Sequence, residues 1–422
     1  MLARPLRAIA LLTAMSGAAG AALAQHSAGC NPAIDHISAR YDTFGSTAIH
    51  ILRAESSDIR QPIVVLTSYL ALTDMDYDTR SPERSASPAG PQAEDEGAFM
   101  FRALARRLAC RGFTVVKYDP ITLHRRTDDT SINHTALEPD AGELRRLQRS
   151  DFSGLLTAVL AAADAHLGTR QPVILVGHSG GAFTVGDFLA RQARASAAGP
   201  RRPTGFVGIA AAVSNDPGVP QTHSQHWVRS LRRCLQTQPA AACVSTLAAD
   251  SHYPMLISAS VREQIAALST THEGDDFLQR AENVLEGFAR DTLNLQRRRL
   301  PGPSQLNGRY EIRSELMDSL QFRSPSAIPI SCLAQSSRLL YGDRDFVVWH
   351  EVESQAWEQA CGSTLDIRVM AGLGHSLGPD KYFGPIDPTA LTTVADAVED
   401  VARDLSPPAP GRHLTQGDGG RP

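Results

Sequence analysis

Short runs of apolar residues alternate along the chain with segments in which apolar residues recur every three or four positions. The runs "PIVVLTSY" from Pro62, "FTVVKYD" from Phe113 and "PVILVG" from Pro172 have the length of buried strands. The segments "FMFRALARRLACRGF" from Phe99 and "DFSGLLTAVLAAADAHL" from Asp151 have helical spacing. This alternation predicts an α/β fold with a mostly parallel sheet and helices on both faces.

The pattern changes twice outside this central part. "ARYDTFGSTAIHILRA" from Ala39 predicts two short strands around a turn at Gly45 and Ser46. From about residue 215 to 335 no clear strand is visible, only helix-like pieces. "SRLLYGD" from Ser337 then predicts a strand, followed by a helix, the strand "TLDIRVM" and a last helix that ends near residue 405.

The pattern therefore predicts one α/β domain with a helical insertion that lies over the sheet's carboxyl edge as a cap. The alternative is a structural or oligomerisation insert that lies away from this edge. The expected divisions are a signal peptide at 1–24, the core at 25–214, the cap at 215–335, the rest of the core at 336–405, and a disordered Pro/Gly-rich tail at 406–422.

The first residues predict export. Arg4 and Arg7 precede an apolar stretch that is too short to span a bilayer, and Ala22-Leu23-Ala24 fits a small-x-small cleavage site. We expect a mature chain from about Gln25, in the periplasm or secreted. No later stretch is apolar enough for stable membrane insertion. The formal net charge of −4 gives no reason to expect a nucleic-acid partner.

All six cysteines follow the predicted cleavage site, and an even number in an exported chain favours disulfides. Six cysteines allow 15 pairings. Sequence order favours Cys234–Cys243 as a local loop and Cys332–Cys361 as a clip, which leaves Cys30–Cys110. Metal binding is the competing interpretation, but no CxxC pair or matched histidine spacing supports it, and we expect no metal site.

The segment Gly177-His178-Ser179-Gly180-Gly181 follows a predicted strand and opens a predicted helix. Such a sharp turn holds the serine in a strained backbone conformation, and the flanking Gly177 and Gly181 relieve the crowding. Ser179 would then project from the sheet edge as a nucleophile. The alternative is a glycine-rich turn with an incidental serine. We expect no catalytic role for His178.

A serine hydroxyl needs a base that accepts its proton, and the base needs a carboxylate that orients it. His375 lies in the Gly-rich "MAGLGHSLG" after the last predicted strand. Asp343 and Asp345 follow the strand "SRLLYG" and are both candidates for the carboxylate.

Together these residues resemble the α/β-hydrolase superfamily, whose chain order is Ser, acid, His. The resemblance covers roughly residues 39–405, with the insertion where the family commonly carries its cap. It implies the triad Ser179, Asp345 and His375, because the family's acid is the third residue after the glycine in "GDRD"; Asp343 is the second choice. A small acyl substrate is implied, and we expect no cofactor.

The oxyanion hole should use the backbone N–H of Gly180, the residue after the nucleophile. Many relatives have His-Gly after the strand that corresponds to "PIVVLT", whereas this chain has Ser68 and Tyr69. Either residue is a candidate for the second donor, and Tyr69 is equally well explained as a packed aromatic.

Three functions follow from this reading. The first is an exported serine hydrolase that cleaves an ester, thioester or amide through an acyl-enzyme. The second is an acyltransferase on the same scaffold, and the third is a hydrolase-fold protein that only binds. The third is weakened because all three triad positions are filled.

Overall fold

The structure is a computed structural model of the 422-residue chain. It describes residues 30–41, 45–53, 61–67, 100–119, 149–195, 202–211, 219–250, 259–297, 303–305, 311–313, 334–345, 348–362, 365–379 and 385–406. The predicted signal peptide and residues 407–422 of the predicted tail lie outside this description.

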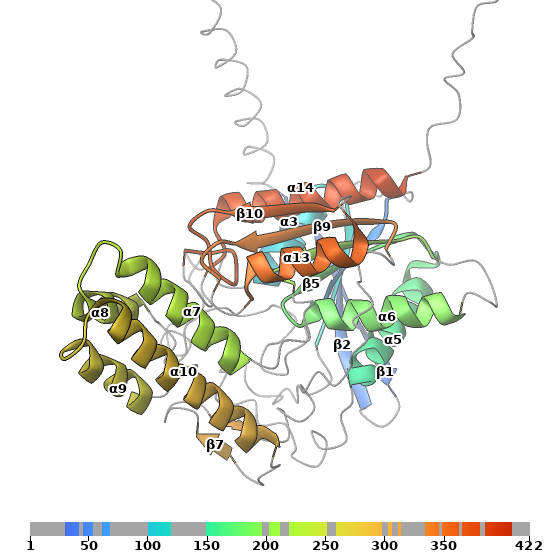
Figure 1. The fold of residues 1–422 in the computed structure, drawn as a ribbon. Helices are drawn as coiled ribbons and strands as arrows, with labels where there is room; N and C mark the ends of the chain where they lie inside the picture. The colour runs from blue at the N-terminus through green and yellow to red at the C-terminus, as the bar shows by residue number, and fades with distance from the viewer. Residues whose placement is uncertain are drawn as a thin grey trace, which may run out of the picture.

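Among the residues described, eight strands form one sheet in the order β1-β2-β4-β3-β5-β6-β9-β10 (Figure 1). Strand β2 runs antiparallel to both of its neighbours, and the other neighbouring pairs are parallel. The predicted mostly parallel sheet is confirmed. The strands are β1 Ala33–Tyr41, β2 Gly45–Arg53, β3 Ile63–Thr67, β4 Thr114–Tyr118, β5 Val173–His178, β6 Thr204–Ile209, β9 Ser336–Gly342 and β10 Asp366–Met370.

Helices cover both faces of the sheet, as the pattern predicts. Side chains of α3 and α14 pack on one face, and side chains of α5, α6 and α13 pack on the other. These helices are α3 Met100–Cys110, α5 Arg149–Leu167, α6 Gly181–Ala195, α13 His350–Cys361 and α14 Pro388–Leu405.

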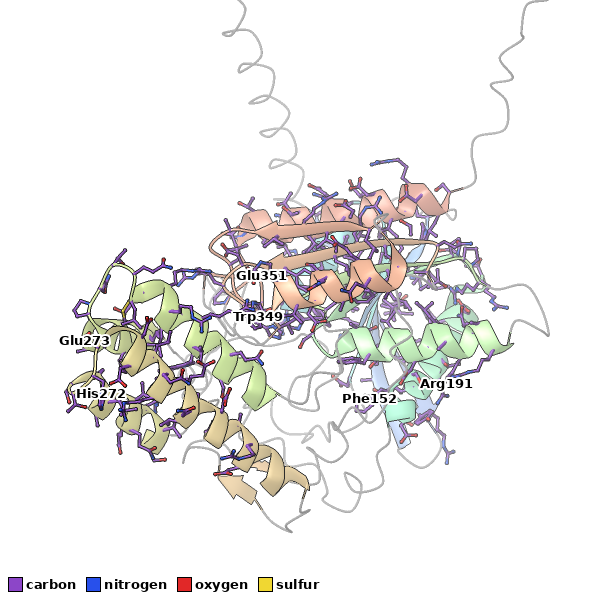
Figure 2. All side chains as sticks on the ribbon, in the orientation of Figure 1. Phe152, Arg191, His272, Glu273, Trp349 and Glu351 are labelled. Atoms are coloured by element: carbon purple, nitrogen blue, oxygen red, sulfur yellow. A yellow bond between two sulfur atoms is a disulfide. The ribbon has the colours of Figure 1, made fainter. Side chains whose placement is uncertain are left out.

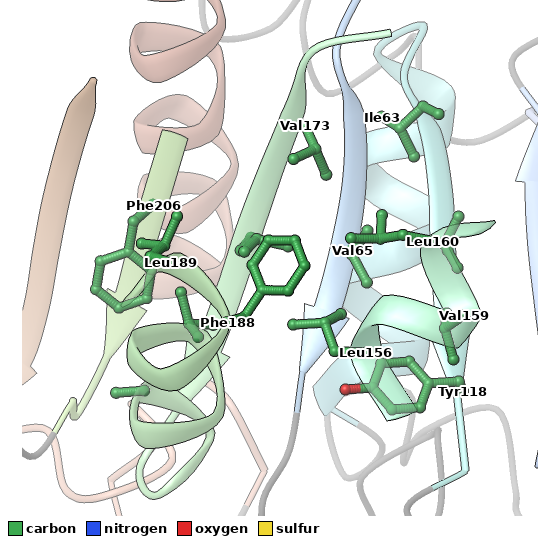
Figure 3. Packing of buried hydrophobic residues seen from close by; sticks show 14 of the residues in the cluster. Ile63, Val65, Tyr118, Leu156, Val159, Leu160, Val173, Phe188, Leu189 and Phe206 are labelled. Atoms are coloured by element: carbon green, nitrogen blue, oxygen red, sulfur yellow. The ribbon is translucent and has the colours of Figure 1, made fainter. Parts of the chain in front are cut away.

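The central strand β5 explains why its sequence is a continuous apolar run. Val173 and Leu175 pack on the α5 and α6 side, where Figure 3 shows the ring of Phe188 below Val173, while Ile174 and Val176 pack toward α3 and α14. A strand that is buried on both faces needs apolar residues at every position.

The first hairpin differs from its prediction. Strand β1 begins at Ala33, six residues before the predicted start, and Gly45 and Ser46 belong to β2, where they pair with Tyr41 and Arg40. Strand β1 lies at the edge of the sheet and most of its residues are partly or fully exposed. An edge strand of this kind has no apolar run to mark its beginning.

Between β6 and β9 the described residues include four helices with a hydrophobic cluster of their own, which contains Trp227, Leu231, Phe277 and Leu285. They are α7 Val219–Cys234, α8 Ala240–Asp250, α9 Ala259–Ser269 and α10 Gly274–Arg297, and Figure 1 shows them as a separate group beside the sheet. We call them the helical group. The predicted cap boundaries at 215 and 335 stay predictions.

The same region also contains strands that the sequence pattern does not predict. Strands β7 Pro303–Gln305 and β8 Glu311–Arg313 form a small antiparallel sheet. Three residues are too few for the alternation of apolar and polar positions to be visible in the sequence.

Two predicted disulfides are confirmed. Cys30–Cys110 ties the segment before β1 to the end of α3, and Cys234–Cys243 joins α7 to α8. Cys361 is also disulfide-bonded, and its predicted partner Cys332 lies outside the described residues. In the part of the chain that the structure describes, no helix has the length and hydropathy needed to cross a bilayer.

Candidate active site

Ser179 occupies a sharp turn between β5 and α6. Its backbone φ is +51°, a left-handed conformation that costs an L-residue with a side chain about 1–3 kcal/mol. Its N–H donates to the carbonyl of Ile209 at 2.9 Å, and its own carbonyl accepts from Ala182 at 3.1 Å. The strained residue is therefore held from both sides, by the end of β6 and by the first turn of α6.

Gly177 permits this turn because the chain folds back on it. A Cβ atom at Gly177 would lie 3.0 Å from the backbone nitrogen of Ala182 and 3.0 Å from the carbonyl carbon of Gly181. Contacts of this length would require these backbone atoms to shift by a few tenths of an ångström. Gly181 is the first residue of α6, so both predicted glycines lie at the turn.

Asp345 and His375 are joined by a hydrogen bond in the interior of the protein. Asp345 Oδ2 lies 2.9 Å from His375 Nδ1, and the two residues are 2% and 0% exposed. The other carboxylate oxygen, Oδ1, accepts the N–H of Val348 at 2.9 Å. Asp345 follows β9 and His375 follows β10, so both side chains come from the carboxyl ends of neighbouring parallel strands.

Asp343, the second choice for the acid, is exposed and has a different partner. Its Oδ1 accepts the backbone N–H of Gly372 at 2.7 Å, in the turn that follows β10. The structure thus pairs the carboxylate of Asp345, and not that of Asp343, with the His375 ring.

The two loops that carry Asp345 and His375 touch through their backbones. A Cβ atom at Gly342 would overlap the carbonyl group of Leu373 and lie 2.6 Å from the carbonyl oxygen of Gly374. The N–H of Arg344 donates to the Leu373 carbonyl at 2.9 Å. Only glycine permits this approach, which brings the acid loop against the histidine loop.

Tyr341 is in strand β9, four positions before Asp345 in the sequence. Its hydroxyl donates to the carbonyl of Ala211 at 2.7 Å and so ties β9 to the second residue after β6. Burial raises the pKa of Tyr341 well above its ordinary value, and the negative charges of Glu353 and Asp345 add to this effect. The hydroxyl therefore stays protonated and keeps its role as a donor.

His178 has contacts that the sequence pattern did not reveal. Its ring is 1% exposed, and Nε2 lies 2.9 Å from the backbone carbonyl oxygen of His375. The centroids of the two imidazole rings are 4.7 Å apart in an edge-on arrangement. Because His178 directly precedes Ser179, this contact brings the His375 loop to the residue next to the predicted nucleophile.

Three residues with a side chain adopt positive φ in the described part of the chain, and all of them lie at this edge of the sheet. They are Ser179, Ala210 after β6 and Leu377 after His375. Strained residues of this kind cluster at functional sites. Their position favours this edge as the site of chemistry.

Gly180, the predicted first oxyanion donor, lies between Ser179 and the start of α6. Ser68 and Tyr69, the candidates for the second donor, lie outside the described residues. Within those residues no group of three or more His, Cys, Asp or Glu side chains is arranged to hold a metal ion.

The chain is similar to several solved hydrolase structures. A thermophilic esterase from Thermogutta terrifontis is 16% identical, covers 88% of this chain and 99% of its own, and has a TM-score of 0.42. An esterase from Rhodococcus sp. ECU1013 is 16% identical over 87% and 99%, with a TM-score of 0.40. A serine hydrolase without a lid from Xanthomonas campestris is 13% identical over 90% and 99%, with a TM-score of 0.37. No protein-family model matches the sequence, and no curated protein sequence matches it.

The fold can now be assigned from the strand order and the turn after β5. An antiparallel β2 beside a run of parallel strands, with a Gly-x-Ser-x-Gly turn between β5 and the following helix, is the α/β-hydrolase fold. The protein has this fold. Because one fold supports many activities, its function has to be argued from the site.

Proposed function

We propose that the protein is an exported serine hydrolase that cleaves a carboxylic ester of a small acyl substrate. The observation that carries the proposal is the buried hydrogen bond between Asp345 and His375, which lies at the same sheet edge as the strained Ser179. A serine, a carboxylate and a histidine, in this chain order, are the parts that an acyl-enzyme mechanism needs in this fold.

The chemistry assigns each group one role. His375 Nδ1–H donates to Asp345, which leaves Nε2 as the nitrogen that accepts the Ser179 proton as Oγ attacks the carbonyl carbon. The tetrahedral oxyanion accepts the N–H of Gly180 and a second donor, for which Ser68 and Tyr69 are the candidates. Collapse breaks the ester bond, and the departing alcohol takes the proton from His375. Water then attacks the acyl-enzyme, with His375 again as the base. When the second tetrahedral intermediate collapses, the acyl–Oγ bond breaks, Ser179 Oγ takes the proton from His375, and the carboxylic acid leaves.

Two features support export. Disulfides persist in oxidising compartments, and Cys30–Cys110 and Cys234–Cys243 are both formed. The sequence before Cys30 has the pattern of a cleavable signal peptide. The mature chain would then begin near Gln25 and act in the periplasm or outside the cell.

The proposal is tested with a fluorophosphonate probe and a panel of p-nitrophenyl esters of increasing acyl length. We expect the probe to label the wild type at Ser179, and Ser179→Ala to lose about a thousand-fold or more of the esterase rate. His375→Ala should lose a similar factor, because the residues act as a unit. Circular dichroism of both variants shows whether the fold is kept.

Three other results of these assays would contradict the proposal and favour a different nucleophile or a different function. Labelling at a different serine, or an active Ser179→Ala variant, would exclude Ser179 as the nucleophile. A wild type that neither reacts with the probe nor hydrolyses any ester would favour the binding protein. Transfer of the acyl group to an added alcohol in preference to water would favour the acyltransferase.

A further inference from the structure

His178 lies where the predicted nucleophile and the predicted base meet, although it belongs to neither. It is the last residue of β5, and its ring Nε2 is 2.9 Å from the carbonyl oxygen of His375, which is 197 positions further along the chain. Strand β5 is fixed on both sides, because β3 and β6 pair with it along its length. The imidazole of His178 is therefore carried by a strand that is paired on both sides.

The chemistry of this contact defines the state of the ring. A backbone carbonyl only accepts hydrogen bonds, so Nε2 of His178 carries the proton and donates. Burial lowers the pKa of His178 well below its ordinary value, and the neighbouring His375 lowers it further. The ring is thus neutral near pH 7 and adds no positive charge beside His375 when that residue gains a proton.

The His375 loop depends on such contacts because it has no strand or helix of its own. Residues 371–379 form turns, closed by hydrogen bonds from Gly374 to Gly378 at 2.8 Å and from Leu377 to Gly374 at 3.0 Å. Asp345 holds the side chain of His375, while His178 holds its backbone. Two anchors on different groups fix both the place and the direction of the imidazole.

We propose that His178 is a positioning residue. Its Nε2–H hydrogen bond to the His375 carbonyl fixes the position of the histidine loop relative to Ser179. The proposal rests on the proposed function, because it assumes that His375 is the base for Ser179 and that His178 orients it. His178 and Ser179 are neighbours in the chain, so one short segment presents the nucleophile and also fixes the base. A base displaced by about 1 Å loses on the order of 100-fold in rate.

A matched pair of substitutions separates the hydrogen bond from the volume of the side chain. His178→Gln keeps an N–H donor at a similar reach, whereas His178→Met has a similar length and no donor. Val173→Ala, at the opposite end of β5, serves as a control for loss of packing, since Val173 is fully buried and lies away from the histidine loop.

We expect His178→Met to lower kcat and the rate of fluorophosphonate labelling by about 100-fold, with KM nearly unchanged. His178→Gln should restore most of this loss. Val173→Ala should lower the thermal unfolding temperature without a comparable loss of labelling rate. All rates are measured well below the unfolding temperature of the variant concerned, so that each refers to folded protein.

The outcomes separate this proposal from the proposed function. Labelling of Ser179 in the wild type is read first, because its absence overturns the proposed function whatever the variants do. If the wild type is labelled and His178→Met keeps the wild-type kcat and labelling rate, the positioning role is wrong. The positioning role is equally wrong if His178→Gln and His178→Met lose the same factor in rate. It is also wrong if Val173→Ala, at a similar loss of thermal stability, loses as much kcat and labelling rate as His178→Met.

Discussion

At the residue scale, the two aspartates after β9 differ in what they touch. Asp345 is buried against His375, while Asp343 is exposed and accepts the N–H of Gly372. A carboxylate that fixes the histidine tautomer is needed for catalysis, whereas an acceptor for a turn N–H can be replaced by an amide oxygen.

We therefore expect Asp345→Asn to lose on the order of ten-thousand-fold in kcat, because the amide no longer stabilises the required tautomer. Asp343→Asn should lose far less, since its side-chain oxygen still accepts from Gly372. Steady-state hydrolysis of the best p-nitrophenyl ester measures both variants under the same conditions. A larger loss in Asp343→Asn than in Asp345→Asn would assign the acid to Asp343.

A second residue-scale prediction concerns pH and His178. The pKa of His178 is lowered well below 6.5 in the folded state, chiefly by burial. Below pH 6.5 the unfolded chain binds a proton at this residue that the folded chain does not bind. The free energy of unfolding should consequently fall as the pH drops, by up to about 1.4 kcal/mol per pH unit from this group.

Urea denaturation of the wild type and His178→Gln between pH 7 and pH 5 measures this contribution as a difference. The difference in unfolding free energy should shift in favour of the variant as the pH falls through this window, because glutamine does not titrate. Carboxylates such as Asp35, whose pKa is lowered from 3.8, act at lower pH and are common to both proteins. Parallel pH curves for the two proteins would contradict the neutral, buried state of the ring.

The sequence predicts the residues of the candidate site better than their contacts. Ser179, Asp345 and His375 all follow predicted strands, and this position makes each a candidate. The choice of Asp345 over Asp343 comes from the resemblance to the α/β-hydrolase superfamily, because both aspartates follow the same strand. The role of His178 is not visible in this way, because its partner is the backbone of a residue 197 positions away. A hydrogen bond to a carbonyl group does not depend on the type of residue that carries the carbonyl.

At the element scale, α7 of the helical group meets the start of α13. The guanidinium carbon of Arg229 lies 3.2 Å from the ring centroid of Trp349, and Nη1 lies 2.7 Å from Oε2 of Glu351. Figure 2 shows Trp349 and Glu351 on the side of the core that faces the helical group. Trp349 follows Val348, whose N–H binds the Asp345 carboxylate, so this contact reaches the segment that holds the acid.

The strength of this contact can be predicted from its exposure. The side chains of Arg229 and Glu351 are 49% and 56% exposed, so the ion pair should contribute only about 0.2–1 kcal/mol. A double-mutant cycle of Arg229→Met and Glu351→Gln, measured by urea denaturation, should give a coupling of about 0.5 kcal/mol that nearly vanishes in about 1 M salt. The methionine keeps much of the packing on Trp349. A coupling that is insensitive to salt would contradict an exposed ion pair.

Elements differ in how plainly the sequence marks them. Strands β3, β4 and β5 are buried and appear as continuous apolar runs, and α14 has Asp387 as its N-cap, which accepts from Thr389 and Ala390. Strand β1 at the sheet edge and the three-residue β7 and β8 lack such signals. Their pairing depends on neighbouring strands, so a local pattern cannot mark their ends.

At the scale of the whole molecule, the parallel strands bring distant parts of the chain to one edge. Strands β5, β6, β9 and β10 lie side by side, and Ser179, Ala210, Asp345 and His375 follow their carboxyl ends. In the chain, the helical group lies between β6 and β9, the strand that precedes Asp345. The sequence order alone predicts this arrangement once the strands are taken as parallel.

The two disulfides fully within the described residues constrain this architecture to different extents. Cys30–Cys110 joins residues 80 positions apart and ties the edge of the sheet to α3, whereas Cys234–Cys243 spans 9 positions within the helical group. In the chain-entropy account, a cross-link stabilises by restricting the unfolded chain, and the loop lengths correspond to about 4.5 and about 2.6 kcal/mol.

We accordingly expect the double substitution Cys30→Ala/Cys110→Ala to lower the unfolding free energy by about 2 kcal/mol more than Cys234→Ala/Cys243→Ala. Urea denaturation of the oxidised proteins measures both losses, and non-reducing mass spectrometry verifies which disulfides remain. Both variants should still react with the fluorophosphonate probe in the folded state, because the first disulfide joins the segment before β1 to α3 and the second lies within the helical group. A larger loss from the short loop would mean that burial of Cys243, which is 0% exposed, outweighs loop length in this protein.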